Sequence, residues 1–376
     1  MSEQIKKTIA KTFLDMAQGL ETGSFATAKI GLMAASSEHG ADELQNALAL
    51  ASRKGIPAEW INEATEAESI AKMEQMLGAG DIDGCVAMHY NFPIGVATVG
   101  KVITPGTGRI MYIATTTGTS DTDRVAGMVK NAIYGIIAAK ADGIENPTIG
   151  ILNIDGARKV EMALTDLKKG GYPINFATSK RDDGGVAIMR GNDALNNPCD
   201  IMVCDSLTGN VLMKFLSSFT TGGAYESLGY GYGPGIGENF NNLVLIVSRA
   251  SGAAVIAGAM EYAASLVKGN WQMIAKAEFA AAKKAGLQAI LAKLTAKPAG
   301  DAAQAQTIPQ EPPKEIATAE ISGIEITDLD DAVHALWREK IYAQSGMGCT
   351  GPVVQVNEAK LEQATKILVE KGFVGE

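Results

Sequence analysis

Residues 201–210 read IMVCDSLTGN, and this stretch decides the fold class. Its first three residues are apolar and suit a short buried strand, and the polar and glycine residues that follow suit the start of a helix. In an open α/β sheet, ligands bind beyond the carboxyl ends of the strands, where such a turn lies. Asp205, Thr208 and Asn210 are therefore candidate binding residues for an anion at the helix start. Asp205 or Thr208 could also cap the helix, and the two roles are compatible.

The same order of strand and helix continues on both sides of this stretch. Apolar, β-branched runs predict strands at 28–33, 84–90, 109–115, 148–154, 185–189, 200–204 and 242–247. Amphipathic patterns predict helices at 42–54, 123–141, 157–169 and 252–267, and a further helical stripe at 287–294. This alternation predicts an α/β fold whose layered, parallel or mixed sheet is covered by helices on both faces.

The chain of 376 residues is longer than one hydrophobic core usually supports, so the body, residues 1–294, could form two lobes. Residues 295–315 are rich in Ala, Gln and Pro and predict an extended, semi-rigid linker. The patterns that resume after the linker are regular structure at 316–326, a helix from 328 toward 342, a strand at 353–356 and a helix at 358–371. We therefore expect a small C-terminal α/β module, residues 316–376, tethered to the body.

The overall composition excludes several classes of function. The net charge is −9 and Lys and Arg form no cluster, which argues against a nucleic-acid partner. The first residues lack the apolar core of a signal peptide, and the apolar stretch 243–264 is interrupted by polar and charged residues, which argues against a membrane span. Four scattered cysteines and three dispersed histidines indicate neither a disulfide framework nor a metal site. We expect a cytoplasmic protein without a metal.

Close to the C-terminal end, residues 346–352 read GMGCTGP and place Cys349 among three glycines. Structural thiols pack among apolar neighbours, whereas glycines let the backbone turn sharply around the sulfur. Backbone N–H groups of Gly348, Thr350 and Gly351 would stabilise a thiolate, or the oxyanion of an acyl group carried on it. Cys349 is thus a candidate nucleophile. The alternative is a structural turn that happens to contain a cysteine.

Two further motifs are candidates for a binding cleft. Residues 248–252 read SRASG, follow a predicted strand and begin a helix, so Ser248, Arg249 and Ser251 form a plausible phosphate seat. Residues 115–121 read TTTGTSD and also lie between a strand and a helix. Their hydroxyl groups would face the cleft, or would form a capped turn.

Two glycine-containing segments resemble nucleotide motifs without matching them. Residues 229–239, GYGYGPGIGEN, fit no register of the dinucleotide motif G-x-G-x-x-G and precede a strand, so we expect a mobile loop over the cleft. Residues 95–102, GVATVGKV, copy a P-loop up to the lysine but place Val102 where a magnesium ligand is required. Neither segment predicts nucleotide binding.

The motifs resemble those of the PlsX family of acyl-carrier-protein:phosphate acyltransferases. That family's D-G-F-x-G-N motif corresponds to DSLTGN at 205–210, and its S-H-G-S motif to SRAS at 248–251, with Arg249 in the place of the histidine. The resemblance implies an isocitrate-dehydrogenase-like α/β fold and the formation of acyl phosphates from thioesters. The departures from both motifs disfavour long-chain carrier-protein substrates.

A resemblance over nearly the whole chain, GMGCTGP included, is to the alpha subunits of component C of glycine/sarcosine/betaine reductase complexes, from amino-acid-fermenting anaerobes. In that family an acetyl thioester forms on a cysteine, and phosphate cleaves it to acetyl phosphate. The resemblance implies that Cys349 is this acyl-carrying cysteine and that Cys85 matches a second cysteine. It also implies an oligomer, with the beta subunit of component C and selenoprotein A as partners. The substrates implied are a small acyl group and inorganic phosphate, without another cofactor.

Together these features predict an acyltransferase that forms acetyl phosphate from an S-acetyl group on Cys349, with a phosphate cleft near Asp205, Asn210 and Arg249. The linker would let the module collect the acyl group from a partner and present it to the cleft. Two alternatives stay open: a free-standing phosphate acyltransferase that uses acetyl-CoA or acyl carrier protein, and a non-catalytic docking subunit. An isocitrate-type NAD-dependent dehydrogenase is disfavoured, because the sequence lacks the acidic metal-ligand cluster that such an enzyme needs.

Overall fold

The computed structural model describes residues 13, 28–33, 37–178, 187–296, 309–325, 328–348 and 351–375. The strands of its body are β1 (Ile30–Met33), β2 (Ala58–Ile61), β3 (Gly84–Ala87), β4 (Val96–Ile103), β5 (Ile110–Thr119), β6 (Thr148–Leu152), β7 (Asn175–Phe176), β8 (Ile188–Met189), β9 (Ile201–Val203), β10 (Gly233–Ile236) and β11 (Val244–Ile246). They form one 11-stranded sheet in the order β2-β1-β3-β11-β10-β4-β5-β9-β6-β7, with β8 beside β6.

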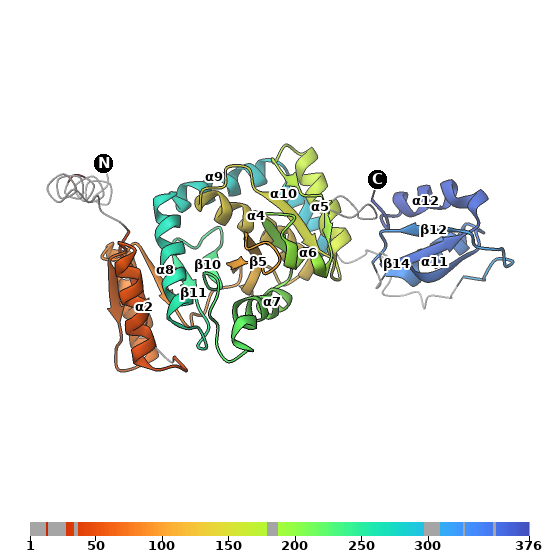
Figure 1. The fold of residues 1–376 in the computed structure, drawn as a ribbon. Coiled ribbons are helices and arrows are strands. Elements are labelled where there is room, and N and C mark those ends of the chain that lie inside the picture. The colour runs from red at the N-terminus through yellow and green to blue at the C-terminus, as the bar shows by residue number, and fades with distance from the viewer. Residues whose placement is uncertain are drawn as a thin grey trace.

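The helices of the body lie on both sides of this sheet (Figure 1). They are α2 (Ala41–Arg53), α3 (Glu66–Ala79), α4 (Arg124–Ala141), α5 (Ala157–Lys169), α6 (Gly191–Asn196), α7 (Ser206–Ser218), α8 (Ala253–Lys268), α9 (Trp271–Lys284) and α10 (Leu287–Thr295), with the short 3-10 helix η1 (Phe219–Thr221). The predicted α/β fold, with helices on both faces of a mixed sheet, is confirmed.

The sheet consists of two parallel parts that run in opposite directions. Strands β2, β1, β3 and β11 are parallel to one another, as are β5, β9, β6, β7 and β8. Between the two parts, β10 is antiparallel to both β11 and β4, and β4 is antiparallel to β5. The carboxyl ends of the two parallel parts therefore lie at opposite edges of the sheet.

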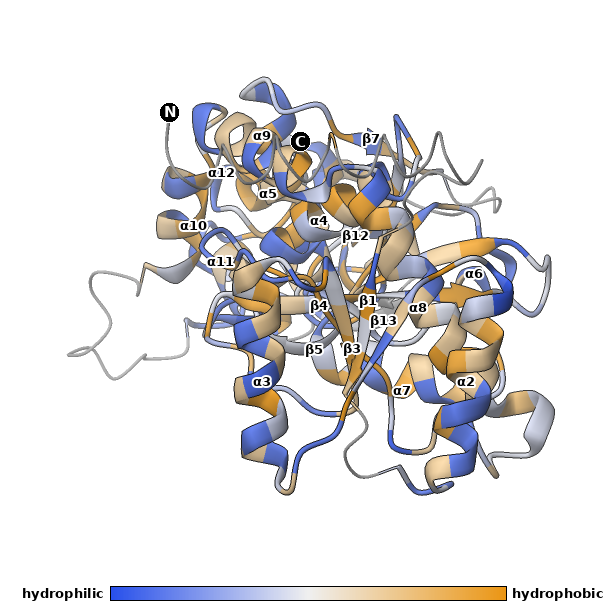
Figure 2. Ribbon diagram, turned by 90° about the vertical axis from the view of Figure 1, so that its left-hand side faces the viewer, coloured by the Kyte–Doolittle hydropathy of each residue, from blue (hydrophilic) through white to orange (hydrophobic). Residues whose placement is uncertain are grey.

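Both faces of the sheet are buried, which explains the continuous apolar runs in the sequence. In β5, Tyr112 and Ala114 belong to one hydrophobic cluster, together with residues of α2, α4, α5, α8, α9 and α10. Their neighbours Met111 and Ile113 belong to a second cluster, together with residues of α3, α6 and α7. This alternation follows the two-residue period of a strand. Figure 2 shows the same layering at the other end of the body, where α2 and α3 lie on opposite sides of β1 and β3.

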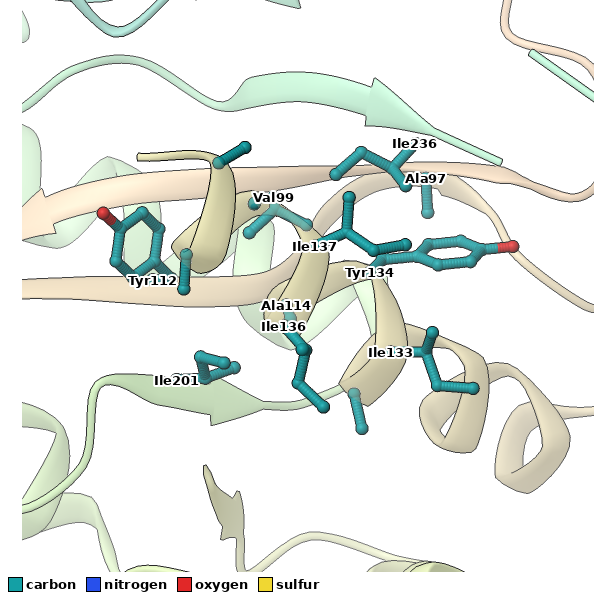
Figure 3. Packing of buried hydrophobic residues seen from close by; sticks show 14 of the residues in the cluster. Ala97, Val99, Tyr112, Ala114, Ile133, Tyr134, Ile136, Ile137, Ile201 and Ile236 are labelled. Carbon is teal, nitrogen blue, oxygen red and sulfur yellow. The ribbon is translucent and has the colours of Figure 1, made fainter. Parts of the chain in front are cut away.

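Helix α4 is buried almost all round and forms the centre of the first cluster. Its residues Ile133, Ile136 and Ile137 pack among side chains of β4, β5, β9 and β10 (Figure 3). Full burial of one such side chain stabilises the fold by about 1.5–3 kcal/mol. Gly135 permits this close approach, because a Cβ there would lie 2.6 Å from Ile201 Cγ2.

The expectation of a mobile loop at 229–239 is wrong, because part of this segment is the buried central strand β10. Its glycines serve close packing. A Cβ on Gly233 would lie 1.6 Å from the carbonyl oxygen of Val99, and one on Gly235 would lie 2.2 Å from the ring of Phe92. The segment 95–102, which resembles a P-loop up to its lysine, lies mostly within the neighbouring strand β4.

The C-terminal part of the chain forms its own antiparallel sheet in the order β12-β14-β13. Its elements are β12 (Ala319–Ser322), α11 (Leu329–Arg338), β13 (Ala343–Gly348), β14 (Gly351–Val356), the 3-10 helix η3 (Glu358–Lys360) and α12 (Leu361–Glu370). They enclose a separate hydrophobic cluster. A small C-terminal α/β module is thus confirmed, whereas the exact domain boundaries at 294 and 315 stay a prediction. Among the described residues, none of the helices has the length and apolar character needed to cross a membrane.

Candidate functional site

Three helices begin at the carboxyl edge of β5, β9 and β6, which are parallel neighbours. Helix α4 follows β5, α7 follows β9 and α5 follows β6. The N-terminal end of a helix carries unpaired N–H groups and a partial positive charge, so it favours an anion. This edge of the sheet is therefore the first place to look for an anion site.

A glycine places the start of α7 directly against β5. A Cβ on Gly209 would lie 1.8 Å from the carbonyl oxygen of Thr115, so only glycine fits this contact. One residue on, the Asn210 amide donates to the carbonyl oxygen of Thr116 at 3.1 Å. These two residues of the DSLTGN motif therefore fix the helix on the strand, which is a positioning role for Asn210.

Asp205 caps α7 and also holds an arginine. Its Oδ1 accepts from the Thr208 N–H at 3.0 Å, and its Oδ2 accepts from the Thr208 hydroxyl at 2.8 Å and from Arg124 Nη2 at 2.9 Å. Burial alone would raise the pKa of Asp205, but the hydrogen bonds from Thr208 and Arg124 hold the pKa below its ordinary value. Asp205 is thus ionised at neutral pH, and its predicted helix cap is present.

Arg124 lies at the centre of this edge. Its guanidinium contacts Asp205 on one side and Asp155, which follows β6, at 3.6 Å on the other. The side chain is 45% exposed, so donor groups of its guanidinium remain accessible to a ligand. The sequence reasoning missed Arg124. The sequence feature that could have indicated Arg124 is its position: it directly follows Asp123, the N-cap of a helix that comes after a strand.

A cavity of about 350 Å³ opens beside Arg124. It is lined by Thr115, Gly118, Thr119, Ser120, Asp121, Thr122, Asp123, Arg124, Gly127, Asn131, Asp205, Ser206 and Leu207. Part of the TTTGTSD segment thus lines this cavity, but the hydroxyl groups of Thr115, Thr116 and Ser120 donate to acceptors inside the fold, so the expectation that the hydroxyl groups face the cleft is wrong for these three. Lys130 lies behind it and pairs with Asp121 at 2.5 Å, and together with local hydrogen bonds this outweighs burial and lowers the pKa of Asp121.

The second predicted phosphate segment lies elsewhere. Ser248, Arg249 and Ser251 follow β11, whose carboxyl end is at the opposite edge of the sheet. Glu226 and Ser227 connect this segment to the C-terminal end of α7. The Glu226 N–H donates to the carbonyl oxygen of Ala250, and the Ser227 N–H donates to the carbonyl oxygen of Ser217. Because α7 has 13 residues, its two ends are about 20 Å apart. The two predicted segments do not meet in one cleft.

Carboxylates of the chain itself bind the serine-rich segment, residues 248–252, and the helix start that follows it. Ser251 is buried, and its hydroxyl donates to Glu226 at 2.9 Å. The first N–H of α8, from Ala253, donates to Glu43 of α2 at 2.6 Å. Glu43 therefore holds the helix start at which the sequence placed a phosphate. Neither glutamate is near this segment in sequence, and no local pattern could have indicated them.

The described cysteines are core residues. Cys85, Cys199 and Cys204 are all buried against the face of the sheet that α3 and α7 cover. Burial raises the pKa of Cys85 and of Cys199 to about 12, and it raises the pKa of Cys204 further. These thiols are therefore protonated at neutral pH in this structure, and the second-cysteine role of Cys85 stays a prediction.

The predicted nucleophile Cys349 and its neighbour Thr350 lie outside the described residues. The strands on either side are described: β13 ends at Gly348 and β14 begins at Gly351, and these two glycines are register partners. The role of Cys349, with Gly348, Thr350 and Gly351 in support, stays a prediction. Among the described residues, no three His, Cys, Asp or Glu side chains are grouped so that they could hold a metal ion.

Comparisons with known proteins agree with this architecture. Residues 33–355 match a family described as fatty acid synthesis protein. The chain is 54% identical over 384 aligned residues to the glycine/sarcosine/betaine reductase complex component C subunit alpha of Peptoclostridium acidaminophilum, covering 98% of this chain and 99% of that protein. It is also 33% identical over 88 residues to the phosphate acyltransferase of Brevibacillus brevis, and 36% over 84 residues to that of Halothermothrix orenii. Each of these alignments covers 24% of the acyltransferase and 23% or 22% of this chain.

Proposed function

The chain belongs to the family of component C alpha subunits of glycine/sarcosine/betaine reductase, within the wider fatty acid synthesis protein family, and on this basis we propose that it forms acetyl phosphate. The substrate is an acetyl thioester on Cys349. A phosphate oxygen attacks the thioester carbonyl carbon, the C–S bond breaks and the sulfur leaves as a thiolate. The acetyl group is transferred without any change of oxidation state.

The observation that carries this proposal is the cavity at the starts of α4 and α7. Phosphate is a dianion and needs a seat with donors already in place. Arg124 offers a planar set of N–H donors, Asp155 and Asp205 hold it in position, and the N-termini of α4 and α7, which are capped by Asp123 and Asp205, face the same cavity. The acidic side chains that line the cavity are engaged: Asp205 by Arg124 and Thr208, Asp121 by Lys130, and Asp123 by the Ala126 N–H. In this proposal Asp205, Thr208 and Asn210 position the seat.

The proposed partners follow from the name of the relative, which is one subunit of component C in a reductase complex. We expect a beta subunit beside this chain and selenoprotein A as the source of the acyl group. A tethered module suits this task, because a thioester formed at a partner has to reach a cavity on the body.

Mass spectrometry of the full chain after incubation with acetyl phosphate tests the covalent step, because the reaction is reversible. We expect an acetyl adduct at Cys349, and no adduct and no acetyl phosphate formation in Cys349→Ala. Cys199→Ala, which removes a buried thiol of the core, is the matched control and should retain both.

Two outcomes would contradict the proposal. If Cys349→Ala formed acetyl phosphate from acetyl-CoA at the wild-type rate, the protein would be a free-standing phosphate acyltransferase. If the wild-type chain, alone and with its beta subunit, neither exchanged acetyl groups with phosphate nor hydrolysed acetyl phosphate in arsenate, it would be a docking subunit.

A further inference from the structure

Helix α5 begins beside the candidate site with a first turn that is electrostatically unfavourable. Its N-cap residue is Gly156, which has no side chain to cap the helix. The first turn contains Arg158 and Lys159 and no acidic residue. Because the N-terminal end of a helix is itself positive, two cations there destabilise it. Glu161 of α5 itself pairs with the Arg158 guanidinium at 3.0 Å, which leaves the N–H groups of the first turn and Lys159 to be bound by partners from other parts of the chain.

The C-terminal module supplies these partners. Glu325 accepts two hydrogen bonds from the helix start, at Oε2 from the Gly156 N–H (2.9 Å) and at Oε1 from the Arg158 N–H (2.8 Å). Asp328 forms an ion pair with Lys159 Nζ at 2.5 Å. Glu325 thus caps the helix through two backbone N–H groups, and Asp328 neutralises Lys159.

Both carboxylates are fixed to the fold of the module. Glu325 follows Ile324, which is 3% exposed and belongs to the hydrophobic cluster of the module. Asp328 is the N-cap residue of α11, and Ala332 and Leu336 of that helix belong to the same cluster. When these carboxylates bind α5, the module as a whole is therefore held there.

We propose that the first turn of α5 is the docking surface of the C-terminal module, and that Glu325 and Asp328 are the latch that holds the module on the body. Asp155, the residue before Gly156, contacts Arg124 of the candidate site. The docking surface is therefore next in the chain to a residue that holds Arg124. Docking through these contacts does not depend on whether Cys349 carries an acyl group.

Hydrogen exchange of the full chain, resolved to single amides, gives a direct test. The N–H groups of Gly156 and Arg158 lie at a helix start, where no carbonyl of the helix can accept them, so their protection depends on Glu325. In Glu325→Ala we expect both amides to exchange at least tenfold faster. The matched control is Glu320→Ala, because Glu320 belongs to the same module but bonds to Gln355 within it. Unchanged exchange rates in Glu325→Ala would overturn the proposal, provided that the amides of β12 and β14 keep their protection.

Charge reversal tests the ion pair without removing a hydrogen-bond acceptor. Lys159→Glu places like charges opposite each other and should release the module, which small-angle scattering would detect as a larger radius of gyration. Asp328→Lys should do the same. The double variant restores an opposite-charge pair and should return the radius of gyration to the wild-type value. If the double variant were as expanded as the single ones, or if neither single variant expanded, the latch would be refuted.

Discussion

Asp205 has two separable tasks, and two substitutions distinguish them. It caps α7 through the Thr208 N–H, and it holds Arg124 in the candidate site. Asp205→Asn keeps a side-chain oxygen for the cap but loses the charge that binds Arg124. Asp205→Ala loses both. We therefore expect the free energy of unfolding to depend mainly on the cap, and the KM for phosphate to depend on the negative charge of Asp205.

The magnitudes follow from the two contacts. Loss of an N-cap acceptor costs about 1 kcal/mol of unfolding free energy. Arg124 is 45% exposed, so its ion pair with Asp205 contributes at most about 1 kcal/mol. With about 0.5 kcal/mol for this exposed pair, Asp205→Ala should lower the free energy of unfolding by about 1.5 kcal/mol, and Asp205→Asn by about 0.5 kcal/mol, since asparagine is an equally good N-cap.

Urea unfolding measures the stability, and hydroxamate formation from acetyl phosphate measures the activity. Asp205→Asn should raise the KM for phosphate about tenfold while its unfolding midpoint barely moves. The matched control is Asp166→Asn, because Asp166 is an exposed residue on α5. It should change neither quantity.

The pH dependence has a definite sign. The pKa of Asp205 is lower in the folded protein than its ordinary value of 3.8, so its contribution is fully present above that value and is lost as the pH falls through the folded pKa. The stability difference between wild type and Asp205→Asn should be constant above about pH 5 and shrink below about pH 4. If Asp205→Asn destabilised the protein as much as Asp205→Ala, the capping argument would fail. If it left the KM for phosphate unchanged, Arg124 would not need Asp205.

Three further outcomes are expected. Gly235→Ala should lower the free energy of unfolding by about 3 kcal/mol, because the added Cβ meets the ring of Phe92, whereas Gly191→Ala, which meets nothing within 4 Å, should be neutral in the same urea titration. Glu43→Ala should cost about 1 kcal/mol, because the first N–H of α8 loses its acceptor; an unchanged urea midpoint would show that this contact contributes nothing. Iodoacetamide at pH 8 should leave Cys85 unmodified in the native chain and modify it once urea is added; modification in the native state would contradict its burial, which raises its pKa to about 12.

The sequence predicted those helices and strands whose hydrophobic pattern matches their burial in the fold. Helix α5 was expected at 157–169 and has those bounds, because its apolar stripe faces the core and Lys168 and Lys169 lie in its last turn. The strands before the candidate site were found because both of their faces are buried, which makes them apolar throughout. In such segments the local pattern is itself a consequence of the tertiary environment.

Strands β4 and β10 were missed for an opposite reason. These two antiparallel strands connect the two parallel parts of the sheet, and we call them the join. Neighbouring segments approach the join so closely that a side chain would clash. Glycines at 233 and 235 meet this requirement, and in a sequence the same glycines are typical of a loop. The close approach depends on Val99 and Phe92, which are remote in the chain, so the local sequence could not distinguish a loop from a tightly packed strand.

The position of the candidate site follows from the same join. Because β4 and β10 reverse the direction of the sheet, the helix starts after β9 and β11 lie at opposite edges, and a phosphate cannot contact both. Ser251 then has a structural explanation: it binds the buried Glu226, which also accepts from the hydroxyl of Tyr232, the residue before β10. Burial and the Glu226 carboxylate both raise the pKa of Tyr232, so its hydroxyl remains a donor at neutral pH. The serine-rich segment therefore stabilises the join through Glu226. The candidate anion site lies instead at the opposite edge, where Arg124 and the starts of α4 and α7 meet.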